Sequence, residues 1–168
     1  QLFVRECAEA IDLALYVDPA VLSRIEDDPP GRRLHSGNLE PFCVLLEGIS
    51  HFVLLAWRAQ QERPVSGLEL EIQAEVDKFV IAWLLLAEQG TPLRSSGALL
   101  RQRLFRDFTL REQVVDDERE RYIRASRVAD SFCGELMRLP GARAVREQAS
   151  HYYRTGLAEK VRQHAIAA

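Results

Sequence analysis

The sequence is poor in features that would reveal a function directly. Its 168 residues include three cysteines, Cys7, Cys43 and Cys133, and none has a Cys-x-x-Cys or Cys/His metal-ligand spacing. We therefore expect reduced thiols that behave as small apolar side chains in a cytoplasmic protein. The chain also lacks a Gly-x-Ser-x-Gly nucleophile motif, a phosphate-binding loop and a dinucleotide-binding fingerprint, so it offers no support for the enzyme classes that depend on them.

Long hydrophobic runs are absent as well. The longest, FVIAWLLLA at residues 79–87, has nine residues, whereas a membrane-spanning helix needs roughly 20. We expect neither a signal peptide nor a membrane contact. Lysine is scarce too, because 20 of the 22 basic residues are arginine, a bias that fits a bacterial gene in a GC-rich genome. Arginine abundance alone is therefore weak support for phosphate binding.

The charges are divided unevenly along the chain, although the net charge is only −3. Residues 1–93 carry 7 basic and 15 acidic side chains, and residues 94–168 carry 15 basic and 10 acidic ones. This asymmetry fits two attracting ends of one bundle, which we favour, or a basic face for an acidic partner. The best case for anion binding is the arginine series Arg101, Arg103, Arg106, Arg111, Arg119, Arg121, Arg124 and Arg127. Acidic residues lie between these arginines, so we expect ion pairs along the helices and no nucleic-acid partner.

Apolar periodicity and helix-capping signals predict a mainly α fold. Helices are expected at residues 1–17, 18–26, 50–62, 66–88, 95–106, 109–137 and 142–165. The clearest helix starts are Asp18 before a proline and the capping boxes Ser66–Glu69 and Thr109–Glu112; Ser95 or Ser96 is expected to cap another helix. We conclude that residues 1–168 form a single domain, an irregular bundle of five to seven helices.

Residues 32–47 leave two alternatives open. The apolar run Phe42–Leu46 suits a short strand, paired in a β-hairpin with Arg32–His35 across the intervening Ser-Gly-Asn. It equally suits the first turns of a helix with Pro41 near its start. So short a run has no periodicity that separates these two structures.

The helix at residues 66–88 carries an apolar stripe with a line of charges beside it. The stripe, which we predict to be core, is Leu68, Ile72, Val76, Phe79, Trp83 and Leu86. Glu71, Glu75 and Lys78 lie together about 80–90° away from it. If the turn at residues 63–66 makes this helix antiparallel to the preceding one, facing residue numbers sum to about 130. Arg58 is then expected opposite Glu71 or Ile72, and His51 opposite Phe79, within reach of Glu75 or Lys78.

These charged residues allow a structural and a functional interpretation. In the structural one, which we favour, Arg58–Glu71 and Glu75–Lys78 are ion pairs and His51 is a hydrogen-bonded core histidine. In the functional one, Glu47, His51, Glu71 and Glu75 line a polar cleft. The catalytic candidates are then His51, Glu75 and Glu47, and the ligand-binding candidates are Arg58, Glu71 and Lys78. The Glu-x-x-x-His spacing matches neither the di-iron nor the zinc-peptidase motif, so no metal site is assigned.

The sequence indicates no cofactor and leaves open whether the protein is an enzyme. Nine consecutive apolar residues, together with Leu99, Leu100, Leu104 and Phe105, exceed what a small bundle easily covers. We therefore expect a homodimer that acts through protein–protein contacts, with itself or with a regulatory partner. The alternative is an enzyme, or a protein that binds a small ligand or metal in the cleft around His51. Weak anion or nucleic-acid binding by the arginine-rich half ranks third.

Overall fold

Seven α-helices, a short π-helix and one two-stranded hairpin form the part of the chain described by the computed structural model, residues 2–7, 10–107 and 116–164. The hairpin comes first, with strands β1 (Leu2–Cys7) and β2 (Ala10–Leu15). The helices are α1 (Pro19–Asp27), α2 (Leu39–Ala59), α3 (Gly67–Glu88), α4 (Leu93–Arg101), the π-helix η1 (Gln102–Arg106), α5 (Asp116–Leu136), α6 (Ala142–Arg154) and α7 (Leu157–His164). The predicted mainly α bundle with a short β-hairpin is confirmed.

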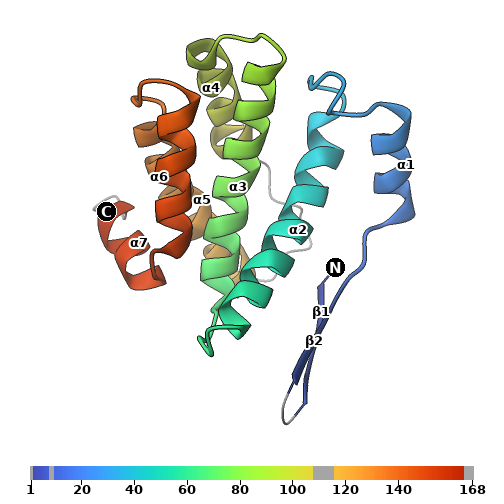
Figure 1. The fold of residues 1–168 in the computed structure, drawn as a ribbon, viewed down its shortest axis with the longest axis vertical. Helices are drawn as coiled ribbons and strands as arrows, with labels where there is room; N and C mark the ends of the chain where they lie inside the picture. Colours follow the sequence, from blue (N-terminus) through green and yellow to red (C-terminus); the bar gives the residue numbers. More distant parts are fainter. Residues whose placement is uncertain (1, 8–9, 108–115, 165–168) are drawn as a thin grey trace.

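Helix α3 lies at the centre of the bundle (Figure 1). It packs against α2, α4, α5 and α6. The Ser66 side chain accepts a hydrogen bond from the Glu69 backbone N–H at 3.2 Å, as the predicted capping box requires. The Glu69 carboxylate, however, accepts a hydrogen bond from Arg58 of α2. Helix α3 thus starts where the sequence predicts, while the second half of the capping box makes a contact with another helix.

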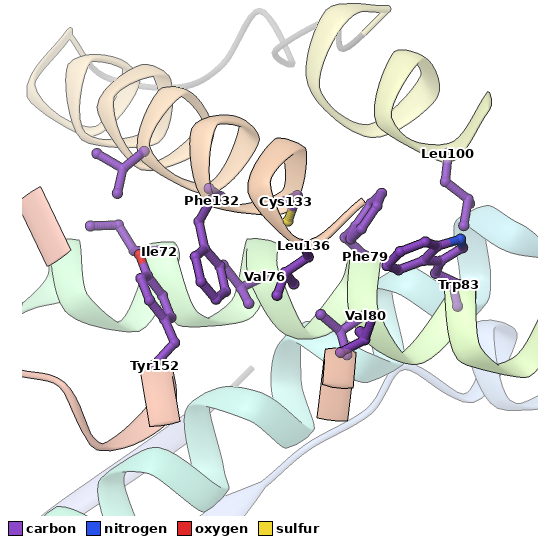
Figure 2. Close-up of a cluster of buried hydrophobic side chains, with 14 of the residues drawn as sticks. Ile72, Val76, Phe79, Val80, Trp83, Leu100, Phe132, Cys133, Leu136 and Tyr152 are labelled. Atoms are coloured by element: carbon purple, nitrogen blue, oxygen red, sulfur yellow. The ribbon is translucent and has the colours of Figure 1, made fainter. Parts of the chain in front are cut away.

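The hydrophobic core is built mainly from α3 and α5, with residues of α4 and α6 closing it (Figure 2). Ile72, Val76, Phe79 and Trp83 of the predicted stripe are at most 2% exposed. The remaining two residues of the stripe are partly buried and pack against this cluster. On the far side, the ring of Phe132 stacks on an α6 tyrosine ring at 3.7 Å between centroids. The predicted core face of α3 is confirmed.

Helix α4 packs very closely on α3 at Trp83. The Trp83 indole N–H donates a hydrogen bond to the Leu93 carbonyl at 2.7 Å, which satisfies its one polar atom inside the core. A Cβ atom at Gly97 would lie 2.9 Å from the Trp83 Nε1, so this approach requires glycine. The helix begins at Leu93, and the side chains of Ser95 and Ser96 donate to the Pro92 carbonyl instead of capping it as predicted.

The hairpin lies at residues 2–15, so the helix predicted at residues 1–17 and the hairpin position predicted at residues 32–47 are both wrong. In the strands, Ile11, Leu13 and Leu15 share one face, because side chains alternate every second residue. On the opposite face Arg5 pairs with Asp12 across the strands, and the Arg5 Nε donates to Asp12 Oδ2 at 3.0 Å. The apolar residues of this segment also fit a helical period. In the hairpin, however, Ile11, Leu13 and Leu15 share one face and the Arg5–Asp12 pair lies on the other.

Helix α2 begins at Leu39, so the helical alternative for this segment is correct and the strand alternative is wrong. The preceding loop fixes this start. Asn38 is buried, and its amide donates to the Asp28 and Arg33 carbonyls at 3.2 and 2.9 Å. Pro41 is in the first turn of α2, where its missing N–H costs no intrahelical bond.

The helix predicted at residues 142–165 is divided into α6 and α7 at Thr155 and Gly156. Thr155 has an extended backbone (φ −69°, ψ 137°), and its hydroxyl donates to the His151 carbonyl at 3.1 Å. Glycine is a poor helix residue, which favours the break at this point. Helix α7 then packs against α5 and buries Lys160 and His164.

Two other predictions concern residues 99–112. The sequence predicts that Leu99, Leu100, Leu104 and Phe105 add to more apolar surface than the bundle covers, but only Leu99 is exposed, at 63%. Leu100 is core, and Leu104 and Phe105 pack against the core from the edge. The capping box predicted at residues 109–112 and Arg111 lie outside the described residues.

Candidate functional site

The polar residues between α2 and α3 meet in a register that differs from the predicted one. Helix α2 ends at Ala59, earlier than expected, because Pro64 follows and Glu62 adopts a left-handed backbone (φ 52°). The longer connection changes which residues of α2 and α3 face each other. Arg58 therefore pairs with Glu69 at 2.5 Å and not with Glu71 or Ile72.

His51 accordingly lies opposite Glu71 and not opposite Phe79. The His51 Nε2 is 3.7 Å from the Glu71 Oε2, and the two side chains are 17% and 9% exposed. Among the described residues this Nε2 has no hydrogen-bond partner, although it is buried. The predicted hydrogen-bonded core histidine therefore has a backbone hydrogen bond with Leu70, while its Nε2 lies beside a carboxylate without a hydrogen bond.

Two turns after Glu71 on α3, Lys78 joins two carboxylates. Its ammonium group donates to the Glu75 Oε1 at 2.7 Å and to the Glu47 Oε2 at 3.1 Å. Burial alone would lower the pKa of Lys78, but the two carboxylates outweigh burial and raise the pKa above its ordinary value. The predicted Glu75–Lys78 ion pair is confirmed, and Glu47 belongs to it.

The pKa values of the His51–Glu71 pair are displaced in opposite directions. Burial, and after it the charge of Glu47, raises the pKa of Glu71 to about 7, although Arg121 and Lys78 act against the rise. Burial lowers the pKa of His51, although Glu47 acts against the fall. Near neutral pH, a carboxyl that readily exchanges its proton therefore lies beside a neutral imidazole. Such a pair can donate or accept a proton in acid–base chemistry.

The sequence candidates thus form one cluster, which we call the acid–base cluster: Glu47, His51, Glu71, Glu75 and Lys78. Arg58 is not part of it, because its guanidinium lies at another level of α2 with Glu69 and donates to the Thr155 carbonyl at 3.5 Å. The described residues contain no group of three or more His, Cys, Asp or Glu side chains placed to hold a metal ion. In the cluster, the Lys78 ammonium takes the position between two carboxylates that a cation would need.

Two residues of α5 act on this cluster through their charge or their own titration, which the sequence did not indicate. Arg121 lowers the pKa of Glu71, and Glu71 and Glu47 contribute, after burial, to the raised pKa of Tyr122. Both residues are more than 40 positions away along the chain, so no local spacing could have predicted their approach.

A second buried polar cluster was missed entirely. The Asp77 carboxylate accepts hydrogen bonds from Ser50 at 2.6 Å and from the Gln73 amide at 2.8 Å. The Gln73 carbonyl in turn accepts from Lys160 of α7 at 2.8 Å. Lys160 is completely buried, and burial lowers the pKa of its ammonium group to about 8. One signal was available: Lys160 and His164 are four residues apart, on the same side of a helix as Leu157.

Three charged residues of α6 and the arginine series lie outside the two buried clusters or at their edge. Glu147, His151 and Arg154 of α6 are exposed. Of the arginine series, Arg101 is paired with Asp130 of α5, and Arg121 lies 3.7 Å from Glu118. These two contacts agree with the prediction that the arginines form ion pairs with acidic residues.

Comparisons of the chain with protein-family models, with curated proteins and with solved structures found no match. Any assignment of function therefore depends on the geometry of the described residues.

Proposed function

We propose that the protein acts through protein–protein contacts and that its first partner is a second copy of the same chain. The observation that carries the proposal is a set of exposed apolar side chains on α2 and the hairpin. It consists of Val4 and Ile11 of the strands and Ile49 and Val53 of α2, which are 41–48% exposed. We call these four residues the hairpin–α2 surface.

Helix α2 is apolar on two sides, and only one of them packs on α3. Leu46, Ser50, Leu54 and Arg58 are buried on the inner side. The opposite side, centred on Ile49, carries Leu45, Phe52, Val53 and Ala56. A helix with a second apolar side in a small bundle is expected to bury that side against another surface.

The hairpin is also expected to pack against another surface. It projects beyond the helices (Figure 1), and each of its two strands has one edge without a partner strand among the described residues. A lone two-stranded sheet is marginally stable in water, and open edges favour pairing with an identical strand. A two-fold dimer would supply both an apolar cover and a partner edge.

The total surface area supports a partner of considerable size. A folded monomer of 19.1 kDa exposes roughly 8,400 Å². This chain exposes 10575 Å². The excess of about 2,000 Å² exceeds the roughly 800 Å² that each partner buries in a standard interface.

A membrane is the other surface that could cover α2. By length and composition, α2 is the one described helix apolar enough to cross a membrane, and 28% of its most apolar stretch is buried in the protein. Its inner side, however, carries Ser50, His51 and Arg58, all in contact with polar groups of α3. Removing α2 from α3 would strand those partners, so we favour a second protein chain as the cover. A bacterial, cytoplasmic location belongs to the same proposal.

Light scattering at micromolar concentration tests the proposal. We expect a mass of about 38 kDa, twice that of the 19.1 kDa chain. Ile49→Asp should give a folded monomer, because a charge on an exposed residue disturbs the interface and not the core. The matched control is Leu99→Asp on α4, which is also exposed and should remain dimeric.

Two results would contradict the proposal. One is a mass of 19 kDa for the parent protein. The other is a monomer that sediments with vesicles of phosphatidylcholine and phosphatidylglycerol, since it would identify lipid as the cover of α2.

A second candidate function is acid–base or ligand chemistry at the acid–base cluster. The observation that favours it is the pKa of Glu71, about 7, beside the unsatisfied imidazole nitrogen of His51. A buried carboxyl kept near its titration point is expensive for stability and is frequent where a proton is exchanged. The stabilities of Glu71→Gln and Glu75→Gln at pH 8 test this candidate.

A further inference from the structure

Helices α2 and α6 flank α3 on opposite sides (Figure 1). Residues of these three helices line a groove. It contains an open pocket of about 350 Å³, which is within the range of small-ligand sites. The residues that line it come from all three helices: Trp57, Asp77, Ala149, Ser150, Tyr153 and Arg154. We call this pocket the α2/α6 groove.

Two aromatic rings form one wall of the groove. The rings of Trp57 and Tyr153 lie 5.2 Å apart between centroids and are tilted by 54°. Small residues one turn earlier on α6, Ala149 and Ser150, leave the space in front of this wall. The Tyr153 hydroxyl oxygen is buried and makes no hydrogen bond within the described part of the chain. Buried hydroxyls usually have a partner, so a ligand with a polar group would satisfy this one.

The groove also contains one acidic and one basic side chain, Asp77 and Arg154. In the described residues, no cationic group lies within 4.0 Å of the Asp77 carboxylate, and Arg154 forms no ion pair with it. Opposite charges thus share a pocket without neutralising each other. Because both residues line the pocket, a molecule in it can contact both.

Asp77 is presented to the groove in a fixed orientation. Ser50 donates to one of its carboxylate oxygens and Gln73 to the other, at 2.6 and 2.8 Å. Each carboxylate oxygen can accept two hydrogen bonds, so acceptor capacity remains on both. Burial raises the pKa of Asp77, while the two hydrogen bonds and the charge of Lys160 lower it. A cationic group in the groove would stabilise the charged carboxylate directly.

We propose that the α2/α6 groove binds a small zwitterion of the amino-acid type. Its ammonium group meets Asp77, its carboxylate meets Arg154, and its apolar side chain lies against Trp57 and Tyr153. A simple amine would leave Arg154 as a repelling charge, and a simple carboxylic acid would be repelled by Asp77. Only a ligand with both charges uses both residues. The site does not depend on self-association.

Binding can be followed by tryptophan fluorescence and by calorimetry. The protein has two tryptophans, Trp57 in the groove and Trp83 in the core. We expect saturable changes with apolar amino acids, tested with L-leucine and L-phenylalanine. N-acetyl-phenylalanine lacks the ammonium group and phenylalaninamide lacks the carboxylate, so each should bind about 10- to 100-fold more weakly than phenylalanine.

Variants of the two charged residues identify which end of the ligand each one binds. Arg154→Gln should weaken phenylalanine about 10- to 100-fold and leave phenylalaninamide unchanged. Asp77→Asn should weaken phenylalanine and leave N-acetyl-phenylalanine unchanged. Arg143→Gln is the matched control, because Arg143 is an exposed arginine of α6 outside the groove.

The proposal is overturned if no amino acid gives saturable binding at millimolar concentration. It is also overturned if Arg154→Gln binds phenylalanine as tightly as the parent protein does. Because Asp77 accepts two structural hydrogen bonds, Asp77→Asn could unfold the chain, and a thermal melt detects this. If Asp77→Asn is unfolded, the binding of phenylalanine and phenylalaninamide to Arg154→Gln decides the question.

Discussion

Two glutamates of α3, one helical turn apart, face different electrostatic situations. Glu75 has Lys78 as a partner at 2.7 Å, and both side chains are buried. Among the described residues, the only basic side chain within 4.0 Å of the Glu71 carboxylate is the neutral His51. The charge on Glu75 is therefore compensated, whereas the charge on Glu71 is buried without a cation in contact. Removal of the charge should have opposite consequences at the two positions.

We expect Glu75→Gln and Glu71→Gln to change stability in opposite directions at pH 8. Glu75→Gln leaves the Lys78 ammonium buried with only Glu47, so it should destabilise by about 1–3 kcal/mol. Glu71→Gln removes an uncompensated charge and should stabilise by about 1–2 kcal/mol. Chemical denaturation of both variants beside the parent measures the two changes.

The pH dependence supplies the control. The folded-state pKa of Glu71 is about 7, above its ordinary value of 4.5, so its contribution to parent stability falls as the pH rises from 4.5 to 7. Glu71→Gln should abolish that decline. His51 acts in the other direction, because its lowered pKa makes stability fall as the pH drops below 6.5. A destabilising Glu71→Gln would show that the cluster is a structural network, as the sequence first suggested, and would remove the support for acid–base chemistry.

At the scale of the element, predictions succeeded where the deciding signals are local. Ser66 and the apolar stripe through Trp83 define α3, because capping and helical period act within a few residues. The prediction for the N-terminal segment was wrong. Its apolar residues fit both a helical and a strand period, and the pairing of the two strands, which includes Asp12, stabilises the hairpin. The sequence did not predict α7 as a separate helix, because Thr155 and Gly156 are only a weak signal for a helix end. The position of α7 depends on its packing against α5.

For the candidate site, too, the local features could be predicted from the sequence and the contacts between distant segments could not. His51 and Glu47 are one turn apart on α2, and Glu71 and Glu75 one turn apart on α3, so their common faces could be predicted from the sequence. Their mutual register could not, because it depends on the exact length of the connection around Pro64. Lys160 could not be placed either, because its partner Gln73 is 87 positions away.

The packing of α4 on α3 leads to a prediction about Trp83. Trp83→Ala should destabilise by roughly 3–5 kcal/mol, because it removes a buried ring and leaves a cavity beside Gly97. It also removes the indole N–H that donates to the Leu93 carbonyl. The control is Leu99→Ala on the same α4 helix, which is exposed and should change stability by less than about 0.5 kcal/mol. A cost under about 1 kcal/mol for Trp83→Ala would contradict the core position of this helix face.

At the scale of the whole molecule, the bundle separates its polar and apolar surfaces in an unusual way. Charged residues such as Arg58, Lys78 and Lys160 are buried between helices, while Ile49 and Val53 face outward. Each buried charge needs partners on a second helix, which reduces the apolar area available for the core. The apolar area displaced to the outside of α2 is the area that a dimer would bury. A homodimer would therefore supply part of the stability that a monomer of this sequence lacks.

Unfolding coupled to dimer dissociation depends on protein concentration. A tenfold increase in concentration adds about 1.4 kcal/mol to the stability of a dimer, or about 0.7 kcal/mol for each chain. For a chain of this size the melting temperature should rise by about 1–3 °C with each tenfold increase. Ile49→Asp should melt at one temperature at every concentration, while Leu99→Asp should retain the dependence of the parent protein. Differential scanning calorimetry over two decades of concentration measures it, and a parent melting temperature that stays constant would exclude a dimer whose dissociation is coupled to unfolding.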